Sequence, residues 1–417
     1  MKTKFRVLVA LAAVVVGAMW LTGCDHYTCS KGATFGASSC TASGNGLGSG
    51  GNNSTQTAFV FFEDTGAGQI AAEGLNVGNT GNFAPVSGFV VPQLPQTLQN
   101  NGAAFGGMVI VSKKYLYISY SANTGAGPNE IAGYSINPAS GALTLIGTSI
   151  PLGGAPFLPA LAADPAGNFV FVSMGTEIGV YAVNPNTGAL TSVGTAPTLS
   201  DPTQMTTDGV GKFLYALEGN SVAAFSYNTS GTLTSVPNSP FTFTNNGSQI
   251  ALNQISGEKS GNFLLGITAE DDPGGGFVDD NVYVLAISQT TNAGALTLNN
   301  AFNTGASPIF LAVSPAAEFV YTFNETFVSQ QQTAVNPMQG YSIGSTGQLT
   351  LVTGSSQIFA TRGMLDQSGT FIFAYVVDSN SLQLSTTPLA VGSDGSVSTT
   401  NFGNAGALGP FVVTDEP

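Results

Sequence analysis

The chain has 417 residues and a formal net charge of −14, and only 8% of its residues are charged whereas 43% are hydrophobic. So few Lys and Arg offer no basic surface for neutralising phosphates, which argues against nucleic acid as a partner. The 54 glycines and the scarcity of charged helix-forming residues favour an all-β chain. Length alone does not decide the number of domains.

Residues 1–23 have the form of an export signal. A basic stretch over 2–6 precedes an apolar run over 7–20, which is too short to span a bilayer comfortably. The Leu-Thr-Gly-Cys step at 21–24 resembles the lipobox of bacterial lipoproteins, in which the cysteine is lipid-modified and begins the mature chain. A secretory leader with a chance cysteine is the alternative. We expect lipid attachment at Cys24, and an extracytoplasmic protein in the cell envelope anchored to a bacterial membrane.

Residues 24–57 are expected to form a flexible tether. From residue 30 onward this segment is rich in Gly, Ser, Asn and Thr and has almost nothing to bury. Cys29 and Cys40 either pair in an oxidising compartment or remain two free thiols. His26 adds only one further ligand to those thiols, so no metal site is predicted in the tether.

The rest of the chain, 58–417, is built from a repeat. A Gly-x-Leu-Thr step recurs, and an apolar strand, a turn and an aromatic strand separate successive copies. Clear copies begin at Gly141, Gly188, Gly231, Gly294 and Gly347, and degenerate ones begin at Gly81 and Gly395. The spacing averages about 52 residues, close to the period of a four-stranded propeller blade.

The seventh copy is divided between the two ends of the chain. Residues 58–62 form an aromatic strand with no strand before it, whereas 410–415 resemble the strand that precedes each aromatic strand. Pairing the two segments would close a ring and hide its sheet edges. The sequence therefore predicts an all-β, seven-bladed β-propeller of four-stranded antiparallel blades, closed by pairing of its N- and C-terminal strands. The C-terminal strand should be the innermost of the first blade.

Two further features of the repeat carry predictions. Aromatic residues recur at the blade period and should pack between neighbouring blades instead of stacking on a ligand: Phe169, Phe171, Phe213, Tyr215, Phe319, Tyr321, Phe371 and Phe373. The intervals 81–141 and 231–294 are long, which indicates insertions. Long loops on a rigid scaffold often provide binding surfaces.

The repeat resembles the lactonase-like seven-bladed propellers, the family that includes bacterial 6-phosphogluconolactonase. The resemblance lies in a Tyr-x-x-Asn-x-x-Ser/Thr-Gly-x-Leu-Thr step at 134–144 and 181–191, and in the Asp-Pro-x-Gly turn at Asp164. It extends over nearly the whole propeller. These positions belong to the scaffold, so they imply the fold more strongly than the activity.

The resemblance also implies a site at the channel mouth, with a His after the Pro that leads into an inner strand and with Glu and Arg nearby. The residues after those prolines are here Ala160, Thr203, Ile309 and Phe411. Because the single His of the chain is His26, histidine-based catalysis in the propeller has no base.

Two positions fit the family pattern. Glu325 ends a stretch similar to the family's Tyr-Val-x-Asn-Glu strand end, and Arg362, the sole Arg after the leader, begins an inner-strand segment. A carboxylate and a guanidinium facing one cleft could bind a carboxylated sugar, or they could form a structural ion pair.

The densest charge in the chain is the acidic loop over 270–280, which contains Asp271, Asp272, Asp279 and Asp280. Carboxylates on a Gly-bearing turn suit Ca²⁺, but the spacing does not match an EF-hand. A solvated hairpin tip without an ion is the simpler interpretation. The sequence thus predicts no cofactor, with Ca²⁺ as the one ion this loop could take.

Two functions follow. The first, which the missing His favours, is a membrane-anchored module that binds a protein, a glycan or a small molecule. The second is a lactone hydrolase of the 6-phosphogluconolactonase-like type. A structural spacer is a third class. We expect a monomer that meets the membrane through its lipid and does not bind nucleic acid.

Overall fold

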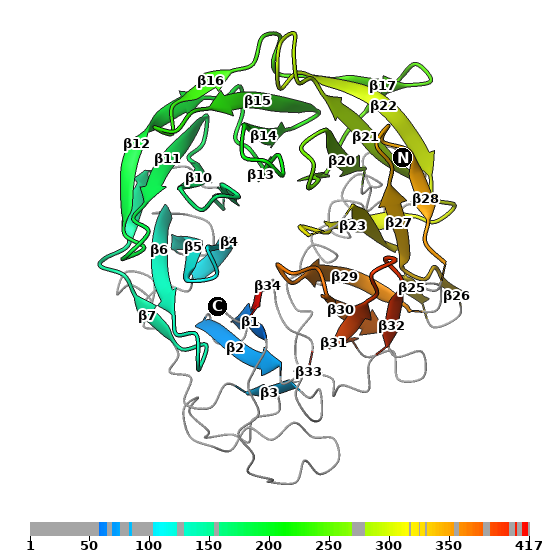
Figure 1. Cartoon of the computed structure of the whole chain (residues 1–417), viewed down its shortest axis with the longest axis horizontal. Coiled ribbons are helices and arrows are strands. Elements are labelled where there is room, and N and C mark those ends of the chain that lie inside the picture. The colour runs from blue at the N-terminus through cyan, green and yellow to red at the C-terminus, as the bar shows by residue number, and fades with distance from the viewer. Residues whose placement is uncertain are drawn as a thin grey trace, which may run out of the picture.

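The computed structural model describes residues 58–64, 69–75, 83–85, 103–122, 129–153, 158–268, 280–316, 318–324, 326–329, 332–353, 358–377, 384–399, 405–406 and 411–415. These residues form seven antiparallel blades arranged in a ring around one axis (Figure 1). The prediction of an all-β, seven-bladed propeller is therefore confirmed. No helix in the described part of the chain has the length and apolar character needed to cross a membrane.

The blades are listed from the innermost strand outward. Blade 1 contains β34 (Phe411–Asp415), β1 (Ala58–Asp64), β2 (Gln69–Leu75) and β3 (Phe83–Pro85). Blade 2 contains β4 (Ala103–Val111), β5 (Tyr115–Ala122), β6 (Asn129–Ile136) and β7 (Leu143–Leu145), and β8 (Ile150–Gly153) also pairs with β6. Blade 3 contains β9 (Leu161–Ala163), β10 (Phe169–Ser173), β11 (Glu177–Val183) and β12 (Leu190–Pro197). Blade 4 contains β13 (Gln204–Thr207), β14 (Phe213–Glu218), β15 (Ser221–Tyr227) and β16 (Leu233–Ser235).

The remaining blades follow the same order. Blade 5 contains β19 (Gln254–Gly257), β20 (Phe263–Ile267), β21 (Asn281–Ile287) and β22 (Leu296–Asn303). Blade 6 contains β23 (Pro308–Val313), β24 (Phe319–Asn324), β27 (Gln339–Ile343) and β28 (Leu349–Leu351). Blade 7 contains β29 (Ala360–Leu365), β30 (Phe371–Val377), β31 (Leu384–Val391) and β32 (Val397–Thr399), and β33 (Ala405–Gly406) pairs with β31.

The ring closes in blade 1, as the sequence predicts. Strand β1 pairs with β34, so that Ala58 lies opposite Asp415 and Phe62 lies opposite Phe411. The other edge of β1 pairs with β2. Around the axis each innermost strand contacts the next one, and β34 contacts both β29 and β4. The C-terminal strand therefore joins the last blade to the second.

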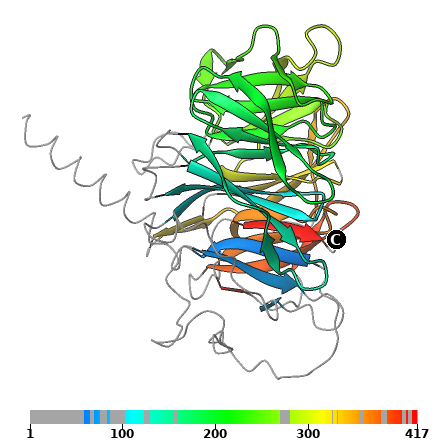
Figure 2. The same ribbon diagram turned by 90° about the vertical axis from the view of Figure 1, so that its left-hand side faces the viewer.

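The two ends of the ring axis differ in the connections they carry. Every inner strand begins at what we call the loop end, where the second strand of a blade leads to its third and the outer strand leads to the next blade. At the opposite turn end lie the tight turns that join the first strand to the second and the third to the fourth. The edge-on view shows the strands of the blades running between these two ends (Figure 2).

Buried carboxylates hold the first turn of several blades. In blade 4 the Asp208 carboxylate accepts hydrogen bonds from the backbone N–H groups of Lys212 (2.7 Å) and Phe213 (2.8 Å). The turn also needs a positive φ, which Gly211 supplies at 72°. The acids at the corresponding position in other blades also accept bonds from their own turns: Asp164, Glu258 and Asp366. The Asp-x-x-Gly motif is thus a structural turn.

Neighbouring blades meet where an aromatic ring packs over a glycine. The first aromatic residue of a second strand lies against the glycine of the Gly-x-Leu-Thr turn in the next blade, and that glycine has a positive φ. Six such contacts occur in the described residues: Phe59–Gly141, Tyr115–Gly188, Phe169–Gly231, Phe213–Gly294, Phe263–Gly347 and Phe319–Gly395. The prediction that the recurring aromatics pack between blades is confirmed for Phe169, Phe213, Tyr215, Phe319 and Tyr321.

Hydrogen bonds reinforce these interfaces at two levels. The Tyr215 hydroxyl donates to the Gly294 carbonyl oxygen of the next blade at 3.1 Å. On the inner strands, the Gln254 side chain donates to the Leu311 carbonyl and accepts from the Leu311 N–H, both at 2.8 Å. Such bonds satisfy backbone groups on the free edges of the inner strands.

The insertions are only partly as expected. The interval 231–294 contains the hairpin of β17 (Phe243–Asn245) and β18 (Ser248–Ile250). A second hairpin, of β25 (Thr326–Ser329) and β26 (Gln332–Val335), lies between β24 and β27 of blade 6 and was not predicted. Its presence leaves the repeat spacing ordinary, so the spacing gives no sign of it.

Candidate functional site

The positions at which the family resemblance implies histidines lie at the loop end. Pro159 and Pro202 directly precede the region where β9 and β13 begin, and Pro308 is the first residue of β23. The residues that follow these prolines are a buried Ala160, an exposed Thr203 and a half-buried Ile309. None of the three side chains can accept a proton at neutral pH, so general-base chemistry must come from another position.

Another set of loop-end positions carries polar side chains, and the sequence analysis missed it. Glu218, Thr268 and Asn324 each stand five residues after the aromatic that begins the second strand, in blades 4, 5 and 6. Their exposed fractions are 4%, 8% and 0%. Within the described part of the chain, Glu218 Oε1, Thr268 Oγ1 and Asn324 Oδ1 have no hydrogen-bond partner.

An unpartnered buried oxygen costs about 1–3 kcal/mol, so three at the same position of consecutive blades call for an explanation. The amino-acid sequence also distinguishes these three blades from blades 2, 3 and 7 at this position. At the same position blades 2, 3 and 7 carry Tyr120, Met174 and Val376, and blade 1 carries Asp64. Polar residues therefore occupy this position in the consecutive blades 4, 5 and 6. We call these three side chains, Glu218, Thr268 and Asn324, the polar arc.

Glu218 is the titratable side chain of the polar arc. Its Oε2 atom accepts a hydrogen bond from the Leu199 N–H at 3.2 Å, and the Ser200 N–H also stabilises the carboxylate. Burial raises the pKa of the Glu218 carboxyl, and these two backbone bonds oppose the rise. One oxygen is therefore fixed by the loop between blades 3 and 4, whereas the other is left for a further partner.

The loop that covers Glu218 has a polar interior and an exposed apolar tip. Burial raises the pKa of Asp201 in this loop, and the buried Thr198 Oγ1 has no partner among the described residues. Leu199 is 76% exposed. A ligand would reach Glu218 by displacing this loop or through a water molecule, because Glu218 itself is covered.

Of the predicted pair Glu325 and Arg362, the structure describes only Arg362. Glu325 lies outside the described residues. Arg362 is exposed on the inner strand β29, and its guanidinium carbon lies 5.4 Å from the ring centroid of Phe310 on the neighbouring inner strand β23. This is the distance of a cation–π contact, which holds the guanidinium against the wall of blade 6.

Of the acidic loop over 270–280, the candidate position for Ca²⁺, the structure describes one residue. Asp271, Asp272 and Asp279 lie outside the described residues. Asp280 is half-buried, and its Oδ1 accepts a hydrogen bond from the Ser307 hydroxyl at 3.3 Å. The described residues contain no group of three or more His, Cys, Asp or Glu side chains that could hold a metal. Cys24, His26, Cys29 and Cys40 also lie outside them.

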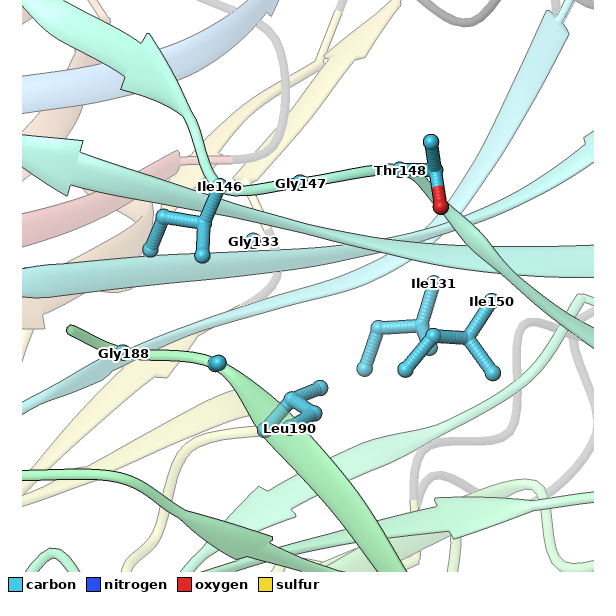
Figure 3. A pocket seen from close by; sticks show the side chains of 9 residues that line it. Ile131, Gly133, Ile146, Gly147, Thr148, Ile150, Gly188 and Leu190 are labelled. Carbon is cyan, nitrogen blue, oxygen red and sulfur yellow. The ribbon is translucent and has the colours of Figure 1, made fainter.

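A cavity of about 310 Å³ lies between blades 2 and 3, away from the polar arc. The side chains of Ile131, Ile146, Ile150 and Leu190 gather around it, and Thr148 supplies the only side-chain hydroxyl (Figure 3). Because no titratable side chain lines it, this cavity offers no catalytic chemistry.

The fold defines a class of protein, the seven-bladed β-propellers, and the repeat resembles the lactonase-like group within that class. Residues 75–205 match the family model described as Lactonase, 7-bladed beta-propeller. That segment runs from the end of β2 to β13 and contains both Tyr-to-Thr steps and the Asp164 turn. No curated protein matches the sequence of the chain.

Solved structures with the same fold are distant in sequence. A periplasmic gluconolactonase from Pseudomonas aeruginosa has a TM-score of 0.59 and 16% identity over 87% of this chain and 100% of its own. For a putative 6-phosphogluconolactonase from Bacteroides fragilis the values are 0.59 and 14%, over 86% and 98%. A protein from Lactobacillus plantarum gives 0.60 and 16%, over 86% and 99%. At these identities the similarity shows the fold alone.

Proposed function

We propose that the chain is a lipid-anchored envelope protein whose propeller binds a hydroxyl-rich, uncharged ligand, such as a sugar or a glycan end, at the loop end. The observation that carries the proposal is the polar arc. Each of its three unpartnered oxygens is able to accept a hydrogen bond, and sugar hydroxyls are suitable donors for such acceptors. The described part of the loop end has Arg362 as its one cation beside the carboxylates of Glu177, Asp201 and Asp280, so it would also repel a phosphorylated ligand.

The anchoring part of the proposal rests on the lipobox at 21–24 and the tether over 24–57. The ligand part rests on Glu218, whose Oε2 is held by the Leu199 N–H so that Oε1 can meet a ligand hydroxyl. Rigid acceptors of this kind give specificity because a ligand lacking the hydroxyl leaves them unpaired.

The alternative function is hydrolysis of an unphosphorylated sugar lactone, and the buried Glu218 carboxylate favours it. As a general base Glu218 would take a proton from water while the water oxygen attacks the lactone carbonyl. The ring C–O bond would then break, and the ring oxygen would receive the proton. The fold shared with a periplasmic gluconolactonase supports this alternative, whereas the absence of His after the inner-strand prolines counts against the family's mechanism.

One experiment separates the two functions. The purified chain is assayed against a panel of unphosphorylated aldonolactones, and binding of the corresponding neutral sugars is measured by calorimetry. The Glu218→Gln variant is compared with Glu177→Gln, which changes an exposed carboxylate at the same end of blade 3. Sugar binding weakened about tenfold by Glu218→Gln alone, with no turnover, supports the binding module. Turnover lost in Glu218→Gln alone supports the lactonase. If neither result is obtained, both functions are refuted.

A further inference from the structure

The lysines of the described residues all lie at the turn end. Lys113 and Lys114 occupy the turn between β4 and β5, Lys212 the turn between β13 and β14, and Lys259 the turn between β19 and β20. Lys113 is half-buried and the other three are exposed. The Lys259 ammonium donates to the Ala316 carbonyl oxygen at 2.6 Å, which holds it close to blade 6.

Several carboxylates at the turn end are buried. Those of Asp164, Asp208, Glu258 and Asp366 are buried and bonded to their own turns. The other carboxylates at this end in the described residues belong to Glu318 and Asp394, which are exposed in turns, and to Asp415, which ends β34. The turn end thus carries four lysines against these three carboxylates, in a protein whose net charge is −14.

The loop end has the opposite character. Its exposed or half-buried carboxylates in the described residues are those of Glu177, Asp201 and Asp280, against the single cation Arg362. The charge of the propeller is thus polarised along the ring axis. Near an anionic surface such a distribution favours the turn end over the loop end, within a Debye length of about 10 Å.

The chain also enters the propeller at the turn end. Ala58 begins a second strand and pairs with Asp415, where the inner strand β34 ends. The next residue, Phe59, packs on Gly141 in a third-to-fourth turn of blade 2. A Gly- and Ser-rich segment as long as 24–57 spans about 30 Å on average. Lipid at Cys24 would therefore bring the turn end nearest to the membrane.

We propose that the turn end docks on the anionic headgroups of the anchoring membrane through its lysines, so that the loop end and the polar arc face away from the bilayer. The proposal rests on the lipid attachment at Cys24 contained in the proposed function. It adds an orientation: the ligand site is presented to soluble or neighbouring-surface ligands, and membrane lipids do not reach it.

A pair of exposed apolar residues in and next to blade 4 allows a direct test. Val210 is 46% exposed in the turn that carries Lys212, and Leu199 is 76% exposed at the loop end. The single tryptophan of the chain, Trp20, lies in the predicted leader. Val210→Trp and Leu199→Trp therefore each place one reporter tryptophan on opposite ends of the mature protein.

The lipidated full-length variants are reconstituted into vesicles containing about 30% anionic lipid, with brominated acyl chains as quencher. We expect fluorescence of Val210→Trp to be quenched about twofold and that of Leu199→Trp to be unchanged, with quenching lost at about 1 M salt because the Debye length falls to about 3 Å. Equal quenching of both, quenching of Leu199→Trp alone, or no quenching of either overturns the orientation.

Flotation of the same vesicles keeps the two proposals apart. Protein that does not float shows that the lipid anchor is absent, whereas protein that floats without quenching of Val210→Trp refutes only the docking. In the Val210→Trp background, Lys212→Glu with Lys259→Glu should abolish quenching. Thr176→Glu with Thr203→Glu adds charge to exposed loop-end positions and should leave it unchanged. Quenching that survives the lysine reversal rejects the role of the lysines.

Discussion

The ring of Phe213 in blade 4 occupies the space that a side chain at Gly294 in blade 5 would need. A Cβ atom at Gly294 would come within 2.5 Å of Phe213 Cδ1, and the backbone there has a φ of +90°. The glycine of the Gly-x-Leu-Thr step is thus required twice, by the turn it forms and by the blade it packs against. This pairing explains why the aromatic residue of one blade and the glycine of the next occur together along the repeat.

Replacing Gly294 by Ala should destabilise the protein by about 2–4 kcal/mol, because a positive φ and an overpacked contact add together. Urea unfolding of the wild type and the variant measures this difference. Gly305→Ala is the matched control, since Gly305 has a φ of +66° and no atom within 4 Å of an added Cβ. It should lose only about 1–2 kcal/mol. Equal losses in both variants would show that the ring contact contributes nothing.

The hydroxyl of Tyr215 joins the same two blades, and Tyr215→Phe should lower the free energy of unfolding by about 1 kcal/mol. The reason is the loss of its hydrogen bond to the Gly294 carbonyl at 3.1 Å. Tyr181→Phe serves as the control, because among the described residues the Tyr181 hydroxyl meets only the Met174 sulfur, at 3.9 Å. Chemical denaturation should show a change in Tyr215→Phe and almost none in Tyr181→Phe. The reverse order would contradict the interface.

The fold could be predicted from the sequence because its determinants are local and repeated. Gly188, Asp208, Gly211 and Phe213 belong to turns and blade contacts that recur in the same order from blade to blade, so each copy confirms the others. Ring closure could be predicted for the same reason, since β34 and β1 are two parts of one copy. Sheet edges left open would have been the only alternative.

The candidate site could not be predicted in the same way. Glu218, Thr268 and Asn324 depart from the repeat, and a departure in one sequence looks like ordinary variation until the burial of each side chain is known. The family pattern points to the residues after the inner-strand prolines, yet the side chains of Ala160, Thr203 and Ile309 cannot accept a proton at neutral pH. The hairpin of β25 and β26 was hidden because the interval that contains it, 294–347, is close to the average repeat length, which the long intervals 81–141 and 231–294 raise.

Gln254 links the inner strands of blades 5 and 6, and Gln254→Ala should destabilise the protein by about 1–3 kcal/mol. Its side-chain amide makes two bonds to the backbone of Leu311, and both Leu311 groups lose their partner in the variant. Hydrogen exchange at the Leu311 amide should accelerate with the loss of stability. Gln289→Ala provides the control, because Gln289 donates to carbonyls without accepting a backbone N–H in the described residues. A Leu311 amide that remains equally protected would contradict the link.

The pH dependence of stability should report on Glu218. Burial raises its pKa in the folded protein above the ordinary value of 4.5, so the folded state holds the proton more tightly than the unfolded chain does. The stability that this group contributes is therefore fully present below the ordinary value and is lost as the pH rises through the raised pKa. Unfolding free energies measured by urea titration from acidic to neutral pH should fall across this window.

Glu218→Gln removes the titration but keeps an oxygen to accept the bond from the Leu199 N–H. The decline of stability with rising pH should therefore be smaller in Glu218→Gln than in the wild type, although burial also raises the pKa of Asp208 and Asp201, which remain. The exposed Glu177→Gln control should follow the wild-type curve. If Glu218→Gln also follows it, the unpartnered oxygen is solvated in the folded protein, and the carboxyl is neither a desolvated acceptor nor a base tuned by burial.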